Sequence, residues 1–313
     1  MVPRHIFVLW LQGERSAPPL VQMCLRRWRR LNPDWDVRVL DRSDVARLLE
    51  DSPVTARSVQ AQALSDVVRI KLLAEHGGVW VDATAFPTAP LDTWLPAAAS
   101  SGFFAFRGHR RPLAVDSWFL AADRDHLVPR LWWEEAERYW SRRRTLVEFA
   151  RNDLWDMNYH LDPLSFFDPA DRATADVYPY YWLMFLFAHL LHTRPEVAEA
   201  WAQVPVVAGH DAHAVQHLNL ADRDVADADL VAAAVRAGVH VQKLSYKIRL
   251  AHRWQRLDSA FEQVDRAHGV SFEDLPVFVP SSERASRLVP AAAVARERLR
   301  RARLAALREL TGG

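Results

Sequence analysis

The stretch LSDVVRIKLLAEHGGVWVDAT, residues 64–84, constrains the fold more than any other part of this chain. Its apolar residues recur at the spacing of one helix face, and the Gly-Gly pair at 77–78 predicts where that helix ends. Residues 79–81 are all apolar, as in a central strand that helices cover on both faces. The stretch therefore predicts a helix packed beside a buried strand, with Asp82 directly after the strand.

The remaining pattern predicts an α/β sheet with helices on its faces, followed by a helix-rich C-terminal half. Strands are expected at 5–11, 35–41, 103–106 and 117–122, and again near 239–244. Helices are expected at 19–31 and at 44–50, the second with Ser43 as its N-cap. From about residue 127 the pattern is mainly helical, including the apolar run at 180–191.

The composition excludes several classes of function. The 40 basic and 39 acidic residues nearly cancel, which leaves no positive excess for binding nucleic acid. Cys24 is the single cysteine, so an internal disulfide is excluded and a reducing cytoplasm is favoured. The apolar runs at 6–11 and 180–191 are too short for a signal-peptide core and a bilayer span, respectively. We therefore expect a soluble, cytoplasmic protein.

Three charged residues of the first stretch are candidates for a ligand site. Asp66 and Arg69 are three positions apart and share a helix face. Taken alone, this pair is an ordinary salt bridge and Asp82 is a turn-forming residue. However, ligands of open α/β sheets bind beyond the carboxyl ends of the strands, where Asp82 is expected. The three residues together therefore predict a ligand pocket.

The segments VPRHIFVLWLQGE, CLRRWRRLNPDW and LSDVVRIKLLAEHGGVWVDAT together resemble glycosyltransferase family 32, and within it the bacterial capsular polysaccharide synthesis group. The resemblance covers about residues 3–125 and, more thinly, residues 239–247. It implies a GT-A fold, a single α/β domain that binds a nucleotide-sugar at the ends of its strands. It also implies transfer of a hexose from a nucleoside-diphosphate sugar to a saccharide or glycoconjugate acceptor, with retention of the anomeric configuration. A UDP-sugar is the favoured donor.

The resemblance also assigns residues to the donor. Trp10 corresponds to the aromatic residue that stacks on the base, and the Asp66–Arg69 pair to the residues that hold the donor sugar. Asp82 and position 84 correspond to the D-x-D acids that bind the ribose and the metal. The full set of donor-binding candidates is Trp10, Gln12, Asp66, Arg69, Gly78, Asp82, Thr84, Lys243 and Lys247.

Position 84 departs from the D-x-D pattern because it is Thr84. Mn²⁺ and Mg²⁺ prefer anionic oxygen ligands, and a neutral hydroxyl is a weak one. Three interpretations stay open: Asp82 anchors the metal with help such as His240, lysines replace the metal, or the protein binds without turnover. Two of the three lysines of the chain, Lys243 and Lys247, are four positions apart and could neutralise a leaving diphosphate.

Other residues are candidates for the reaction centre and the acceptor side. Asp116 either approaches the transferred sugar or belongs to a turn, and Trp118 either stacks on that sugar or belongs to the core. The segment at 155–162 adds Asp156 and His160 to an acceptor groove. The catalytic candidates are Asp82, Asp116 and Lys247, and the metal candidates are Asp82 and His240.

The expected organisation is a glycosyltransferase domain at 1–285 and an Arg-rich helix at 286–313. Within the domain we expect a donor-binding part at 1–125, a helical acceptor-side part at 126–238 and a closing segment at 239–285. The Arg-rich helix offers peripheral contact with anionic lipid at the inner face of the membrane, or is simply solvated.

The main alternative is a non-catalytic nucleotide-sugar or glycan-binding protein on the same fold, motivated by Thr84. An aspartate-nucleophile phosphohydrolase is disfavoured because its second acid is also missing at position 84. A dehydrogenase is disfavoured because G-x-G-x-x-G is absent. The histidines at 210–217 are spaced like zinc ligands, but no H-E-x-x-H glutamate accompanies them.

Overall fold

The computed structural model describes residues 1–52, 54, 59, 61–109, 113–146, 177–221, 227–245 and 257–261. All of them belong to one compact unit, Met1–Val279. The helix predicted at 286–313 lies outside the described residues, as do Asp156, His160 and Lys247. The predicted division into a domain and a terminal helix therefore stays a prediction.

A five-stranded mixed sheet with the order β2-β1-β3-β6-β5 forms the centre of this unit. β1 (His5–Leu9) is parallel to β2 (Asp36–Leu40) and to β3 (Gly78–Val81). β6 (Phe119–Ala122) is antiparallel to β3 and to β5 (Phe103–Ala105). All four residues of β3 are buried, as predicted for a strand covered on both faces.

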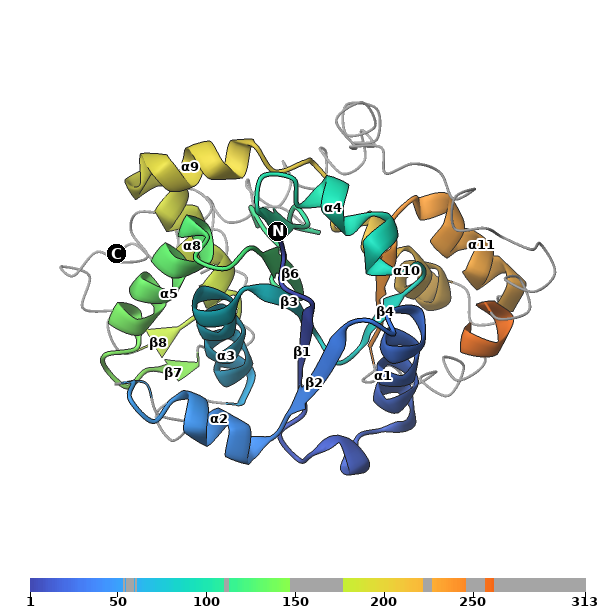
Figure 1. Cartoon of the computed structure of the whole chain (residues 1–313), viewed down its shortest axis with the longest axis horizontal. Coiled ribbons are helices and arrows are strands. Elements are labelled where there is room, and N and C mark those ends of the chain that lie inside the picture. The colour runs from blue at the N-terminus through green and yellow to red at the C-terminus, as the bar shows by residue number, and fades with distance from the viewer. Residues whose placement is uncertain are drawn as a thin grey trace, which may run out of the picture. The chain divides into compact units, whose positions relative to one another are not determined.

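Helices cover both faces of the sheet, with α2, α3, α5 and α8 on one side and α1, α10 and α11 on the other (Figure 1). This arrangement confirms the predicted α/β class. The helices of the described residues are α1 (Pro19–Leu31), α2 (Arg42–Leu48), α3 (Ala61–His76), α4 (Leu95–Ala98), α5 (Leu127–Tyr139), α8 (Trp182–Thr193), α9 (Pro195–Ala202), α10 (Ala214–Ala221) and α11 (Asp227–Ala237). Short 3₁₀ turns lie at η1 (Glu14–Ser16), η2 (Leu91–Thr93) and η4 (Asp211–His213). No helix in this part of the chain combines the length and apolar character that a bilayer crossing requires.

The start of α2 corrects one prediction. Asp41, rather than Ser43, is the N-cap, because its carboxylate accepts hydrogen bonds from the backbone N–H groups of Ser43 at 2.7 Å and Asp44 at 3.1 Å. Asp44 returns a bond from its side chain to the backbone N–H of Asp41, which completes a capping box. The helix consequently begins two residues earlier than its apolar pattern suggests.

Two further strand pairs lie outside the main sheet. β7 (Thr145–Leu146) is parallel to β8 (Val177–Tyr178). β4 (Ala85–Pro87) is antiparallel to β9 (Val241–Lys243), in a register that sets Ala85 opposite Lys243. The strand near 239–244 was predicted, but its pairing with β4 was not. This pairing brings the C-terminal end of β9 beside the residues that follow β3.

The turn between α3 and β3 depends on glycine. Gly77 has a φ of +63° and Gly78 a φ of +93°, which L side chains rarely adopt. A Cβ on Gly77 would lie 2.7 Å from the backbone nitrogen of Arg124, in the loop after β6. The Gly-Gly pair therefore allows α3 to end against the neighbouring strand.

We expect Gly77→Ala to lower the free energy of unfolding by roughly 1–3 kcal/mol more than Gly238→Ala. Gly238 is a matched control because its φ is +66° and a Cβ there meets nothing within 4 Å. In both variants the positive φ destabilises the folded state, and only Gly77→Ala adds a clash with the backbone. Urea unfolding monitored by circular dichroism measures the difference; equal losses would contradict the clash.

Candidate active site

A cavity of about 660 Å³ opens at the carboxyl ends of β1 and β3. Its walls come from the loop after β1, the first turns of α3, the loops after β3 and before β6, the start of α8 and the end of β9. The sequence-predicted residues that line it are Trp10, Gln12, Asp66, Arg69, Asp82, Thr84, Asp116, Trp118 and Lys243. The size is that of a ligand pocket rather than of a packing defect.

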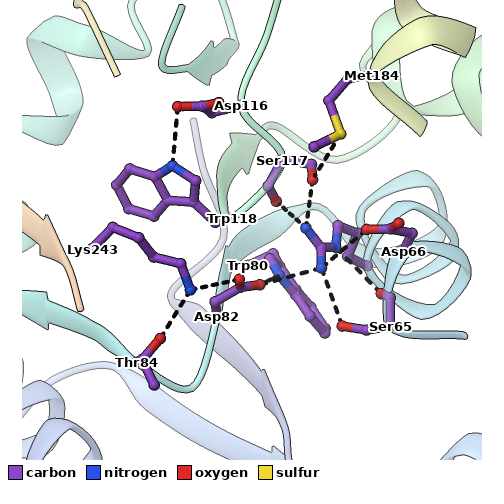
Figure 2. Close-up of polar contacts among 11 residues, drawn as sticks. Ser65, Asp66, Trp80, Asp82, Thr84, Asp116, Ser117, Trp118, Met184 and Lys243 are labelled. Carbon is purple, nitrogen blue, oxygen red and sulfur yellow. Dashed lines mark hydrogen bonds and ion pairs between the residues drawn. The ribbon is translucent and has the colours of Figure 1, made fainter. Parts of the chain in front are cut away.

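Asp82 lies at the centre of the polar contacts in this cavity (Figure 2). Its Oδ1 is 3.2 Å from Nη2 of Arg69, and its Oδ2 is 2.8 Å from Nζ of Lys243. Trp80 donates its indole N–H to the same Oδ1 at 3.3 Å. Burial opposes the charge of Asp82, but Lys243 and Arg69 outweigh it and lower the pKa of the carboxyl. Asp82 is therefore ionised and held by two cations.

Arg69 uses all three guanidinium nitrogens within the protein. Nε and Nη2 donate to the backbone oxygen and hydroxyl of Ser65, at 3.3 and 3.1 Å. Nη1 donates to the backbone oxygen and hydroxyl of Ser117, at 2.7 and 2.6 Å. Nη2 also pairs with Asp66 at 3.1 Å, besides Asp82. The predicted sugar-binding arginine thus fixes the positions of the two acids around it.

Asp66 has an environment that disfavours its charge. Burial raises its pKa most and the neighbouring Asp82 adds to this effect, whereas Arg69 lowers it, with a net result of about 6. Its side chain is 13% exposed and lines the cavity. A carboxyl with such a pKa either accepts or donates a hydrogen bond near neutral pH, which suits contact with a hydroxyl of a ligand.

Asp116 lines the cavity, but its carboxylate is already engaged. Oδ1 contacts the ring Nδ1 of His109 at 2.7 Å and its backbone N–H at 3.2 Å, and Oδ2 accepts the indole N–H of Trp118 at 3.2 Å. The carboxylate is therefore placed to orient His109 and Trp118. His109 also lines the cavity, and no motif in the sequence pointed to it.

Trp118 is largely a core residue. Its ring stacks on Phe106 at a centroid distance of 4.8 Å, and it is 5% exposed. Its edge meets His213, which in turn stacks on His109 at 4.7 Å. Burial lowers the pKa of His213 to about 4, so this histidine is neutral near pH 7. The core alternative considered for Trp118 accounts for these contacts.

Two aromatic residues at the start of α8 extend the cavity wall. Tyr180 and Tyr181 both line it, and Tyr180 is 42% exposed. The ring of Tyr181 lies 6.4 Å from that of His109. Flat aromatic faces at a pocket rim suit stacking on a sugar ring. The sequence placed these tyrosines only in an apolar helical run, and their alignment with the cavity depends on the packing of α8.

Two predicted site residues lie elsewhere. Gly78 is at the opposite end of β3 from Asp82, where a Cβ would lie 3.0 Å from the backbone oxygen of His5. His240 is buried, packs against Trp94 at a centroid distance of 5.7 Å, and does not line the cavity. The metal pair predicted from Asp82 and His240 is therefore not brought together.

The donor atoms near Asp82 do not fit a D-x-D metal site. Lys243 Nζ lies 2.8 Å from Asp82 and 2.9 Å from the hydroxyl of Thr84, between the two side chains that would hold the cation. Two unit charges of like sign 4 Å apart repel by about 4 kcal/mol near a protein surface, and a divalent ion beside the ammonium roughly doubles this. Among the described residues, no group of three or more His, Cys, Asp or Glu side chains is arranged to hold a metal ion. The histidines at 210–217 therefore do not form such a group either.

The raised pKa of Asp66 predicts a pH-dependent stability. Between the unfolded pKa of 3.8 and the folded pKa of about 6, the folded state binds more protons than the unfolded state. The free energy of unfolding contributed by Asp66 therefore falls as pH rises through this window, by up to roughly 3 kcal/mol.

We expect the difference in unfolding free energy between the wild type and Asp66→Asn to fall from pH 4 to pH 6 and then to level off. Urea unfolding of both proteins across this range measures the difference, and the pair cancels the other titrating groups. A difference that stays constant, or that grows with pH, would contradict the raised pKa.

Two glycosyltransferases are similar in sequence to part of this chain. The chain is 27% identical over 172 residues to O-glycosyltransferase braB of Annulohypoxylon truncatum, covering 48% of this chain and 41% of that protein. It is 33% identical over 100 residues to glycosyltransferase afumC of Aspergillus fumigatus, covering 25% of this chain and 24% of that protein. The chain thus matches less than half the length of these relatives.

Among solved structures, the PaToxG glycosyltransferase aligns with 84% of this chain and 87% of its own, with a TM-score of 0.37 and 10% identity. The sequence profile of the capsular polysaccharide synthesis proteins matches residues 2–158. This range contains α3 and β3, and with them the charged cavity residues Asp66, Arg69 and Asp82. The chain therefore belongs to the capsular polysaccharide synthesis protein family.

Proposed function

We propose that this protein is a glycosyltransferase that transfers a hexose from a nucleoside-diphosphate sugar to an acceptor hydroxyl of a saccharide or glycoconjugate. A UDP-sugar is the favoured donor. The observation that carries the proposal is the cluster of Asp66, Arg69, Asp82 and Lys243 in a cavity at the strand ends. Ligands of open α/β sheets bind at this place. The family and the names of its two relatives support the same class of reaction.

Four residues of the cavity wall form the donor side in this proposal. Trp10, directly after β1, and Asp66 both line the cavity, and we assign Trp10 to the base and Asp66 to the hydroxyl groups of the sugar. Lys243 carries positive charge toward the diphosphate, where negative charge develops as the bond breaks. Arg69 acts through Asp66 and Asp82, whose carboxylates it holds in place.

We assign Tyr180, Tyr181 and His109 to the acceptor side, because they also line the cavity and Asp116 orients the ring of His109. In the proposed reaction the anomeric carbon loses its bond to the diphosphate oxygen, which keeps the electron pair. It gains a bond to the acceptor oxygen, and the hydroxyl proton passes to the departing diphosphate. This retaining route needs no base of the protein, and the anomeric configuration of the product, read by NMR, tests it.

The function itself is tested by incubating the full chain with a panel of nucleoside-diphosphate sugars and oligosaccharide acceptors. Release of the nucleoside diphosphate together with a lengthened acceptor supports the proposal. Binding of a donor without any product, under all acceptors and metal ions tried, would instead favour the non-catalytic nucleotide-sugar-binding protein that Thr84 motivates.

We expect Asp82→Asn to abolish detectable transfer, because the neutral amide no longer holds Arg69 and Lys243 in place. Asp92→Asn is a matched control: Asp92 also pairs with an arginine, Arg4, and accepts an indole N–H from Trp35, but does not line the cavity. Transfer rates corrected for the folded fraction measure the effect, and a rate like that of the control would contradict the assigned site.

We expect Tyr180→Ala to raise the KM for the acceptor by roughly 5- to 100-fold and to leave the KM for the donor unchanged. The reason is the loss of one aromatic stacking contact, which contributes about 1–3 kcal/mol. Tyr180→Phe keeps the ring and is expected to keep the KM. Initial rates with each substrate varied in turn separate the two constants. A change confined to the KM for the donor would contradict the assignment of Tyr180 to the acceptor.

A further inference from the structure

The contacts of Lys243 carry a further inference, which rests on the proposed function. We propose that the ammonium of Lys243 takes the place of the divalent cation at the donor site, so that this protein binds nucleoside diphosphates without a metal. The ligand is the diphosphate of the donor, and the residues that define the site are Asp82, Thr84 and Lys243 (Figure 2).

The backbone sets the position of this lysine. β9 pairs with β4 in a register that places Lys243 opposite Ala85, and the next N–H, of Leu244, donates to the backbone oxygen of Thr84 at 3.0 Å. The side chain therefore starts beside the residues that follow β3 and reaches across them. Its Nζ donates to Asp82 at 2.8 Å and to Thr84 at 2.9 Å. These are the two positions that would hold a cation between them in a D-x-D site.

The local charges balance without a metal. Arg69 and Lys243 supply two positive charges, and Asp66 and Asp82 two negative ones, all lining the same cavity. A lysine ammonium has three N–H donors, of which two are directed at Asp82 and Thr84. The third is available for a phosphate oxygen. The side chain of Lys243 is 19% exposed, so a ligand in the cavity can reach it.

The same geometry explains why position 84 suits threonine. A second aspartate there would add a negative charge at hydrogen-bond distance from Nζ and would make the balanced cluster net negative, which disfavours a diphosphate. A hydroxyl accepts the hydrogen bond and fixes the ammonium without adding charge. The departure from D-x-D and the placement of Lys243 are therefore two parts of one arrangement.

Isothermal titration of the full-length chain with UDP, GDP, ADP and CDP tests the inference, each nucleotide in EDTA and in MnCl₂. We expect one nucleotide to bind with nearly the same Kd in both conditions. Binding only in the presence of Mn²⁺ would overturn the metal-free site while the proposed function stands. Binding of no nucleotide in either condition would overturn the proposed function as well.

Variants of the lysine give a second test. Lys243→Gln is expected to weaken the binding of that nucleotide in EDTA by roughly 10- to 100-fold, the loss of one hydrogen bond from a charged donor. Lys71→Gln is the matched control, because Lys71 is also buried and ion-paired, with Glu75, but does not line the cavity. Equal affinities of the two variants would overturn the assignment.

A double variant, Lys243→Ala with Thr84→Asp, rebuilds two acids with no ammonium between them. We expect its nucleotide binding to be weak in EDTA and restored by Mn²⁺, the reverse of the wild type. Circular dichroism and thermal unfolding establish the folded fraction of each variant before titration. A folded double variant that binds equally with and without Mn²⁺ would overturn the inference that Lys243 substitutes for the cation.

Discussion

The carboxylate of Asp82 is the contact on which the rest of the cavity depends. It joins a guanidinium from α3, 13 positions earlier, to an ammonium from β9, 161 positions later. The carboxylate is partly buried, which opposes its charge, and the two cations outweigh that effect and lower its pKa. The three elements α3, β3 and β9 are therefore held in register by charge as well as by packing, and the polar wall of the cavity has little freedom to rearrange.

The loop before β6 connects the two sides of this cavity. Ser117 accepts two hydrogen bonds from Arg69, and Trp118 accepts the backbone N–H of Asp82 through its own backbone oxygen. Asp116, one residue earlier, holds His109, which also lines the cavity. Three consecutive residues thus link the Asp66–Arg69–Asp82 cluster to the imidazole of His109. Preorganisation of this kind lowers the cost of aligning two substrates.

Much of the fold follows from local sequence. The helix, Gly-Gly turn and apolar strand of residues 64–84 were predicted because period, glycine placement and burial act within a few residues. Asp66, Arg69 and Asp82 were expected at one pocket from this local pattern, and Trp10 from the family resemblance; all four line the cavity. The pairing of β4 with β9 and the contact of Asp116 with His109 were not predicted, since they depend on tertiary packing that leaves no periodic signal. His240 precedes β9 and packs against Trp94 instead of lining the cavity, and only the tertiary packing decides this.

The long sequence separation between Asp82 and Lys243 has a consequence for protein synthesis. A chain folds from its N-terminus as it leaves the ribosome, at about 5–20 residues per second. Asp66, Arg69 and Asp82 emerge together, and at that stage acids outnumber bases around the nascent pocket. The second cation arrives only when residue 243 is exposed, 161 positions after Asp82. The charge set around Asp82 is therefore completed only late in synthesis, and a chain that ends before residue 243 lacks one of the two cations that hold this carboxylate.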